Sequence, residues 1–174
     1  MSIKEVGQAI RNDLREKGYK SRDINVRTGY SGYSSTVDLT IKDLAIQRNE
    51  IVKLVNRYKV MSYDDQTGEV LLGGNTYIRV EYDFNLVYEA IEAKLEEAQK
   101  IWEDLQSLNA YETKIIVENK NYLVQAGSSK IKGAPGIQTL DKNNNLKRID
   151  YGHTFCNDPY NIAHFLVFFE AQNE

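Results

Sequence analysis

The stretch INVRTGYSGYSSTVDLTI, residues 24–41, decides the fold of this chain. It contains two runs suited to strands, Ile24–Thr28 and Thr36–Ile41, separated by a connection of residues 29–35 that carries two glycines. Apolar residues alternate with polar ones in the second run, which is the period of a strand with one buried face. Because glycine adopts a positive φ without strain, the connection is predicted to be a turn or a short loop. The stretch therefore predicts two strands with one face on a core.

Helices are predicted on both sides of these strands. Ser2 and Glu5 form a capping-box pattern at the start of the chain, and Gly18 is placed to end the first helix. The apolar residues of this helix recur at helical spacing: Ile3, Val6, Ile10 and Leu14. After the strands, Asp43 is expected to cap a second helix. The buried stripe of that helix would consist of Leu44, Ile51, Leu54, Val55 and Tyr58.

Two more strands complete the first part of the predicted fold, the first of them a short paired segment. Val60–Tyr63 would pair with Val70–Leu72, and Thr76–Tyr82 would follow, with glycines marking the turns. The expected order is αββαββ over residues 1–83, which we take as the first lobe.

A long helix is predicted over residues 84–109. Asp83 can cap it, and its apolar residues fall on one stripe. At a rise of ~1.5 Å per residue it would be nearly 40 Å long, more than a small sheet needs as cover. We expect it to connect two halves of the molecule, and its amphipathic character leaves room for a homodimer.

Residues 110–174 predict a β-rich second lobe closed by a helix. Lys114–Val117 would pair with Tyr122–Ala126, and Ile137–Leu140 with Leu146–Tyr151. Asp158 and Pro159 are suited to the cap and first turn of a helix that runs to Glu170. A strand is the alternative there, because Phe165, Val167 and Phe169 also alternate. The fold class is therefore α+β.

Composition narrows the function without naming it. Cys156 is the only cysteine, so no intramolecular disulfide is expected, and a reduced thiol favours the cytoplasm. No apolar run approaches the ~18 residues of a membrane span, so we expect no membrane contact. Counting Lys and Arg against Asp and Glu gives +3 for residues 1–42 (8 against 5), −6 for 43–109 (7 against 13) and zero for 110–174 (7 against 7). A general DNA binder usually carries a basic excess over a whole domain.

Three sets of residues are candidates for binding. Exposed tyrosines stack on bases or anchor protein interfaces, and Tyr30 and Tyr33 fall in the predicted turn. One row on the first helix could face phosphates: Lys4, Gln8, Arg11 and Arg15. One row on the long helix could occupy a basic nucleic-acid channel: Glu89, Glu92, Glu96 and Glu103. The structural alternatives are tyrosines folded back on the sheet and charged helix faces turned to solvent.

Reactive side chains cluster only around residues 153–164. His153, Cys156 and Asp158 lack the second ligand pair of a zinc site, so no metal or other cofactor is expected. His153 and His164 could act as general acid and base in RNA cleavage. Alternatively, His164 is a core residue, because it falls within an apolar helix. We expect a binding protein rather than an enzyme, since no nucleotide-binding loop or nucleophile elbow is found.

Two stretches of the first lobe form a recognisable pattern. The first consists of Val26-Arg27, the Gly/Ser/Tyr turn and Ser35–Ile41, and the second of Tyr63-Asp64-Asp65 followed by Gly73–Val80. Through these stretches, residues of about 24–82 resemble one of the large polyvalent protein-associated domain families. Domains of these families are modules of very large phage and plasmid proteins, and they also occur as small free-standing proteins. The resemblance implies a protein of a mobile genetic element that works in the cytoplasm of a bacterial host.

Three functions are compatible with that context. Small free-standing proteins of mobile elements often disarm host defence, so we expect an anti-CRISPR that binds a type II RNA-guided nuclease or its guide ribonucleoprotein. Contact with RNA or DNA could accompany this binding. The alternatives are a small nucleic-acid-processing enzyme, such as a ribonuclease that trims guide RNA, and a nucleic-acid-binding accessory module.

Overall fold

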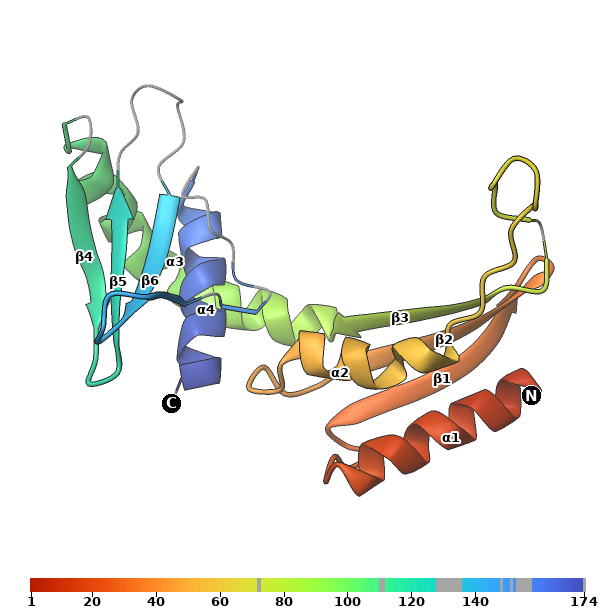
Figure 1. Cartoon of the computed structure of the whole chain (residues 1–174). Coiled ribbons are helices and arrows are strands. Elements are labelled where there is room, and N and C mark those ends of the chain that lie inside the picture. The colour runs from red at the N-terminus through yellow and green to blue at the C-terminus, as the bar shows by residue number, and fades with distance from the viewer. Residues whose placement is uncertain are drawn as a thin grey trace. The chain divides into compact units, whose positions relative to one another are not determined.

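The computed structural model describes residues 1–71, 73–109, 112–127, 136–147, 149–150, 152 and 158–173 (Figure 1). It confirms the α+β class and the order helix, strands, long helix, strands, C-terminal helix. The chain divides into two compact units, Met1–Leu86 and Val87–Glu174. The division falls in the first turn of the long helix α3, Phe84–Gln106.

The first unit is built on a three-stranded mixed sheet in the order β1-β2-β3. Its elements are α1 (Ile3–Glu16), β1 (Ile24–Ser31), β2 (Ser34–Ile41), α2 (Arg48–Val55), the 3₁₀ turn η1 (Asn56–Tyr58) and β3 (Thr76–Tyr82). β1 and β2 are antiparallel, whereas β2 and β3 are parallel. Parallel neighbours need a crossover, and residues 42–75 with α2 supply it.

One face of this sheet carries the core of the unit. Val26, Leu39 and Val80 lie in one cross-strand row and are all buried. Both helices cover this face: α1 buries the predicted stripe together with Gly7, and α2 buries Ile51 and Val55. Each side chain of the row faces inward because strand residues alternate between the two faces, so the period of β2 predicted its buried side correctly.

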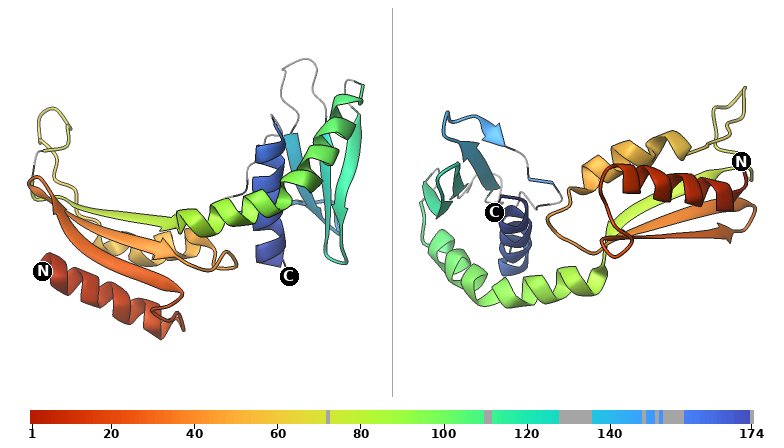
Figure 2. Two further views of the ribbon diagram at one scale, coloured as in Figure 1. Left: turned by 180° about the vertical axis from the view of Figure 1, so that it is seen from behind. Right: turned by 90° about the horizontal axis from the view of Figure 1, so that it is seen from below.

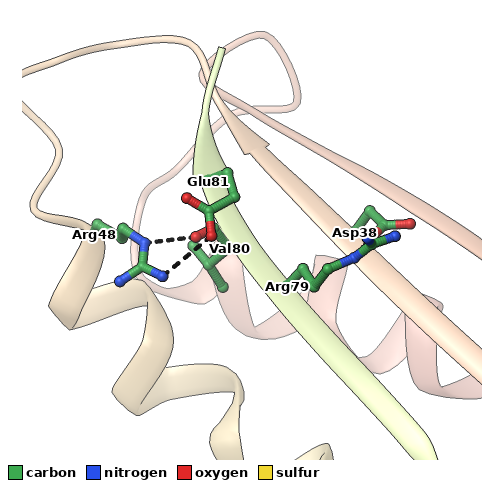
Figure 3. A network of polar contacts seen from close by, with 5 residues as sticks. All are labelled: Asp38, Arg48, Arg79, Val80 and Glu81. Atoms are coloured by element: carbon green, nitrogen blue, oxygen red, sulfur yellow. Dashed lines mark hydrogen bonds and ion pairs between the residues drawn. The ribbon is translucent and has the colours of Figure 1, made fainter. Parts of the chain in front are cut away.

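On each edge strand of the sheet, one backbone carbonyl accepts a hydrogen bond from an arginine of the neighbouring helix. Arg11 on α1 donates to the carbonyl of Val26 on β1 at 2.7 Å, and Arg48 on α2 donates to the carbonyl of Val80 on β3 at 2.6 Å. Figure 3 shows Arg48 reaching to β3, where it also contacts the carboxylate of Glu81. Unpaired backbone groups on an edge strand invite pairing with another chain. Each arginine satisfies one such carbonyl, and the two carbonyls lie in the same cross-strand row of the sheet.

Two predicted features of this unit are wrong. The segments 60–63 and 70–71 do not form a regular hairpin: Tyr63 meets Val70 in an isolated bridge, and Val60 pairs with Thr76 instead. Leu72 lies outside the described residues. The unit is therefore αββαβ. The second helix begins at Arg48, since the carboxylate of Asp43 accepts the N–H of Ala45 and caps a turn before the helix.

In its described residues, the second unit consists of a four-stranded antiparallel sheet, in the order β4-β5-β6-β7, and two helices. Its strands are β4 (Thr113–Glu118), β5 (Tyr122–Gly127), β6 (Gly136–Asp141) and β7 (Leu146–Lys147), and its helices are α3 and α4 (Pro159–Asn173). The predicted hairpin of β4 and β5 is confirmed, and that of β6 and β7 is confirmed with a shorter second strand. Ile149 and Asp150 lie in no strand, and residues 148 and 151 lie outside the described residues. The turns of the two hairpins are held by side chains, since Asn119 accepts the N–H of Tyr122 at 2.8 Å and Asp141 accepts that of Asn145 at 2.9 Å. Pairing of β5 with β6, which sequence did not predict, joins the hairpins into one sheet.

Helix α4 forms the centre of the second unit. Every residue from Ile162 to Phe169 is buried. Viewed from below, α3 and the strands form an arc with α4 inside it (Figure 2, right). Lys94 of α3 donates to Glu170 at 2.6 Å, and the ring of Tyr122 on β5 meets that of Phe169 with centroids 6.2 Å apart. The alternative of a strand is therefore wrong, because a helix that is apolar on all sides belongs inside a core.

Candidate interaction surfaces

Tyr30 and Tyr33 project from the end of the β1–β2 hairpin. Ser31 pairs with Ser34, so the turn consists only of Gly32 and Tyr33 and is shorter than the predicted connection. Gly32 has φ of 60°, which a two-residue hairpin turn with glycine in first place requires. Tyr33 is 90% exposed and Tyr30 is 75% exposed. The tyrosines are therefore turned to solvent and do not fold back on the sheet.

A buried asparagine holds the neighbouring loop, residues 59–75, against this hairpin. Asn75 is only 2% exposed. Its side chain accepts the N–H of Ser62 at 2.7 Å and donates to the carbonyl of Leu71 at 2.8 Å. The backbone carbonyl of Asn75 accepts the N–H of Ser35, at the start of β2, at 2.8 Å. Figures 1 and 2 show the loop beside the β1–β2 turn.

Together the hairpin, the loop and the start of β3 expose a set of apolar side chains, which we call the tyrosine tip. It consists of Tyr30, Tyr33, Tyr63, Val70, Leu71 and Tyr77. The loop and the hairpin touch at Gly73, which has φ of 96°. A Cβ atom added at Gly73 would lie only 3.3 Å from the Cβ of Tyr33. Sequence reasoning missed the contribution of the loop, because its residues were placed in regular strands. Gly73-Gly74-Asn75, next to a run with three apolar residues, was the available sign of an irregular loop.

The loop also makes the tip acidic. Residues 59–75 contain Asp64, Asp65 and Glu69 against Lys59 alone, a net charge of −2. The N–H groups of Thr67 and Gln66 hold the pKa of Asp64 below its usual range, and they fix the turn around it. Asp65 and Glu69 are exposed. The tip thus combines exposed aromatic rings with carboxylates.

The basic row of α1 is divided by the fold. Lys4 and Arg15 are exposed, whereas Arg11 is half-buried and its guanidinium is bonded to β1. Arg11 and Arg15 line a groove of about 510 Å³ between α1 and the start of β1, together with Lys20, which the sequence did not single out. Lys4 lies outside the lining of this groove. Two of the three predicted cations are therefore brought together.

The acidic row of α3 faces solvent along its length. Glu89, Glu92 and Glu96 are all exposed. Glu96 accepts a hydrogen bond from Lys100 at 2.8 Å, which lowers the pKa of its carboxyl group. The row is therefore partly neutralised at one end, as expected for a charged helix face in water.

The histidine pair of the enzymatic alternative is only half described. His164 lies in α4, where it is 6% exposed and its ring centroid is 4.9 Å from that of Phe168. His153 and Cys156 lie outside the described residues. Within the described part of the chain, no three His, Cys, Asp or Glu side chains are grouped as a metal site would require. Nor does any described helix combine the length and apolarity needed to cross a bilayer.

No protein-family model, no curated protein and no solved structure matches this chain.

Proposed function

We propose that this chain is a non-enzymatic binding protein that docks its tyrosine tip on a basic protein surface. The observation that carries the proposal is the exposure of Tyr30 and Tyr33 beside a loop that Asn75 holds in place. Tyrosine is enriched among the residues that dominate interface energies. A loop whose backbone is already fixed loses little conformational entropy on binding, so more of the contact energy contributes to affinity.

The charge of the tip favours a protein partner over a nucleic acid. Single-stranded nucleic acids need a positively charged groove beside the stacking rings. The loop of the tip instead has a net charge of −2, with Asp65 and Glu69 exposed. Carboxylates and aromatic rings are suited to a surface that normally binds phosphates and bases. A basic nucleic-acid-binding surface of another protein is therefore the complementary partner.

A host nuclease or its guide ribonucleoprotein supplies such a surface. The resemblance of residues 24–82 to domains of phage and plasmid proteins supports this target, since mobile elements encounter these nucleases on entry. Occupation of the nucleic-acid channel would block the nuclease sterically. The chain would then act as an anti-defence protein, an anti-CRISPR, without chemistry of its own.

A cleavage assay tests this function directly. A type II RNA-guided nuclease, its guide and a target duplex are incubated with and without the chain, and DNA products and guide length are read on one gel. Loss of cleavage with an intact guide is the expected result. Normal cleavage would refute this target. A shortened guide would refute the non-enzymatic mechanism and direct attention to His153 and His164.

Matched variants test whether the tip is the contact. Tyr33→Ser should weaken binding about 30-fold, as for an interface residue that contributes ~2 kcal/mol, whereas Tyr160→Ser, an exposed tyrosine of α4, should have little effect.

Charge reversal separates the tip from the two helix rows. Replacing Asp65 and Glu69 by lysine should weaken binding. The turn should stay intact, because the carboxylate of Asp64, which accepts the N–H groups of Gln66 and Thr67, is retained. Reversal of Glu92 and Glu96, or of Arg11 and Arg15, should then have the smaller effect. The opposite order would place the contact on a helix row.

A further inference from the structure

The groove beside α1 is a second surface of the first unit, separate from the tyrosine tip. It is formed by the C-terminal half of α1, the turn after it and residues 24–26 of β1, whereas the tip begins at Tyr30. The two surfaces therefore lie at opposite ends of β1 and share no residue. A volume of about 510 Å³ lies within the range of small-molecule sites, roughly 300–1,000 Å³.

The walls of the groove are cationic. Arg11, Arg15 and Lys20 line it, and no Asp or Glu of the described residues does. Among the described residues none of the three forms an ion pair with a carboxylate. Arginines elsewhere in the unit do, since Arg57 pairs with Asp13 and Arg79 with Asp38. A cluster of three cations without carboxylate partners attracts a ligand with more than one negative charge.

The floor of the groove is apolar, and among the described residues one aromatic ring lies at its wall. Leu14, Ile24 and Val26 are buried, and Tyr19 is half-buried at the wall. Burial, with the nearby carboxylate of Glu50, raises the pKa of the Tyr19 hydroxyl, so the ring stays neutral. A neutral ring can stack on a nucleic-acid base. The groove thus offers cations and a stacking surface to the same ligand.

The hydrogen bonding of the β1 backbone disfavours an extended peptide as the ligand of this groove. A peptide strand would add to the edge of β1 through its outward carbonyl groups. Arg11 already occupies the carbonyl of Val26 at 2.7 Å. The same hydrogen bond fixes the guanidinium at the wall of the groove, where its charge is held in place before any ligand arrives.

We propose that this groove binds a nucleotide, with Arg11, Arg15 and Lys20 on its phosphate and Tyr19 on its base. The nucleotide is either free in solution or part of a single-stranded nucleic acid. This inference is independent of the proposed docking of the tyrosine tip, and either can fail without the other.

The test uses the full chain and three probes: inorganic phosphate, adenosine monophosphate and a short fluorescent single-stranded oligonucleotide. Binding is followed by anisotropy for the oligonucleotide and by backbone amide shifts for all three. The expected result is binding with shifts confined to residues 11–26. An oligonucleotide that binds more tightly than the mononucleotide identifies the strand as the source, and equal affinity identifies the free nucleotide.

A matched pair of double variants tests the cations. Arg15→Gln with Lys20→Gln should weaken binding tenfold or more and spare the Arg11 contact with β1. For the oligonucleotide it should also reduce the slope of log affinity against log salt, by at most ~0.7, which is the contribution of one neutralised phosphate. Arg27→Gln with Lys42→Gln removes the same charge from exposed residues outside the groove and should change affinity less than threefold.

Variants of Tyr19 test whether its ring stacks on the base. Tyr19→Ala should weaken nucleotide binding about tenfold and leave phosphate binding unchanged, whereas Tyr19→Phe should retain affinity. Far-UV circular dichroism confirms that each variant is folded. The proposal is overturned by equal losses in both double variants, by phosphate binding as tightly as the nucleotide, by binding of an acidic peptide in place of nucleotides, or by no binding at millimolar concentrations.

Discussion

At Gly7 the absence of a side chain lets α1 lie directly on β1. A Cβ at this position would come within 2.4 Å of Cγ2 of Thr28, far inside ordinary contact distance. Thr28 is β-branched and sits on the buried side of the sheet, opposite Val37. The glycine therefore serves close packing, although it costs helix propensity of about 1 kcal/mol relative to alanine.

Substitution of Gly7 by alanine should therefore destabilise the first unit. We expect a net loss of about 1–2 kcal/mol, because overpacking outweighs the gain in helix propensity. Thr28→Ser removes the clashing methyl group and should restore much of the loss in the double mutant. Urea unfolding of the four proteins measures this coupling. A stabilised single mutant, or a double mutant without rescue, would show that α1 and β1 do not pack as described.

At the scale of elements, one carboxylate joins α1 to the end of the second helical segment. Asp13 of α1 accepts a hydrogen bond from the hydroxyl of Tyr58 in η1 at 2.6 Å and forms an ion pair with Arg57. The guanidinium of Arg57 also lies 5.1 Å from the ring centroid of Tyr58. The three side chains lock the two helical segments together on the same face of the sheet.

This link should make the free energy of unfolding decrease at low pH. Burial alone would raise the pKa of Asp13, but the hydrogen bonds from Tyr58 and Arg57 outweigh it, so the pKa in the folded state lies below the usual value. In the unfolded chain the Asp13 carboxylate has an ordinary pKa of about 3.9, so it binds a proton more readily than in the folded chain. The stabilisation is complete above that pH and disappears as the pH falls through the folded pKa. Asp13→Asn should flatten the dependence of unfolding free energy on pH below about 5, and an unchanged slope would rule out the link.

At the scale of the whole molecule, the two units carry separate cores. Leu39 is buried in the first unit and Phe168 in the second. Trp102, the only tryptophan, lies in α3 and therefore in the second unit. Its fluorescence can report on that unit alone, whereas far-UV circular dichroism reports on both.

Core truncations should accordingly act on one unit at a time. Leu39→Ala should cost about 2–5 kcal/mol in the first unit, visible as an early change in circular dichroism, and should leave the midpoint of Trp102 fluorescence unchanged. Phe168→Ala should lower that fluorescence midpoint. Coincident shifts of both probes in both mutants would show that the chain unfolds as one cooperative unit.

Sequence alone determined the features that depend on neighbours along the chain. The alternation of Val37, Leu39 and Ile41 identified the buried face of β2, because successive side chains of a strand point to opposite sides. Asp83 marked the start of the long helix, since its carboxylate accepts the N–H of Asn85 at 3.1 Å. Asp43 misled for the same local reason, because it caps a turn as readily as a helix.

Tertiary structure decided what depends on residues far apart. The period could not tell a helix from a strand over Ile162–Phe169, and only enclosure by α3 and the sheet makes the helix. Arg11 and Arg15 belong to one predicted row, yet only Arg11 reaches the Val26 carbonyl. The backbone carbonyl of Tyr33 accepts the N–H of Gly74, about forty positions later, at 3.2 Å. Local periodicity encodes which face of an element is buried, whereas the partner that meets that face is fixed only when distant segments pack.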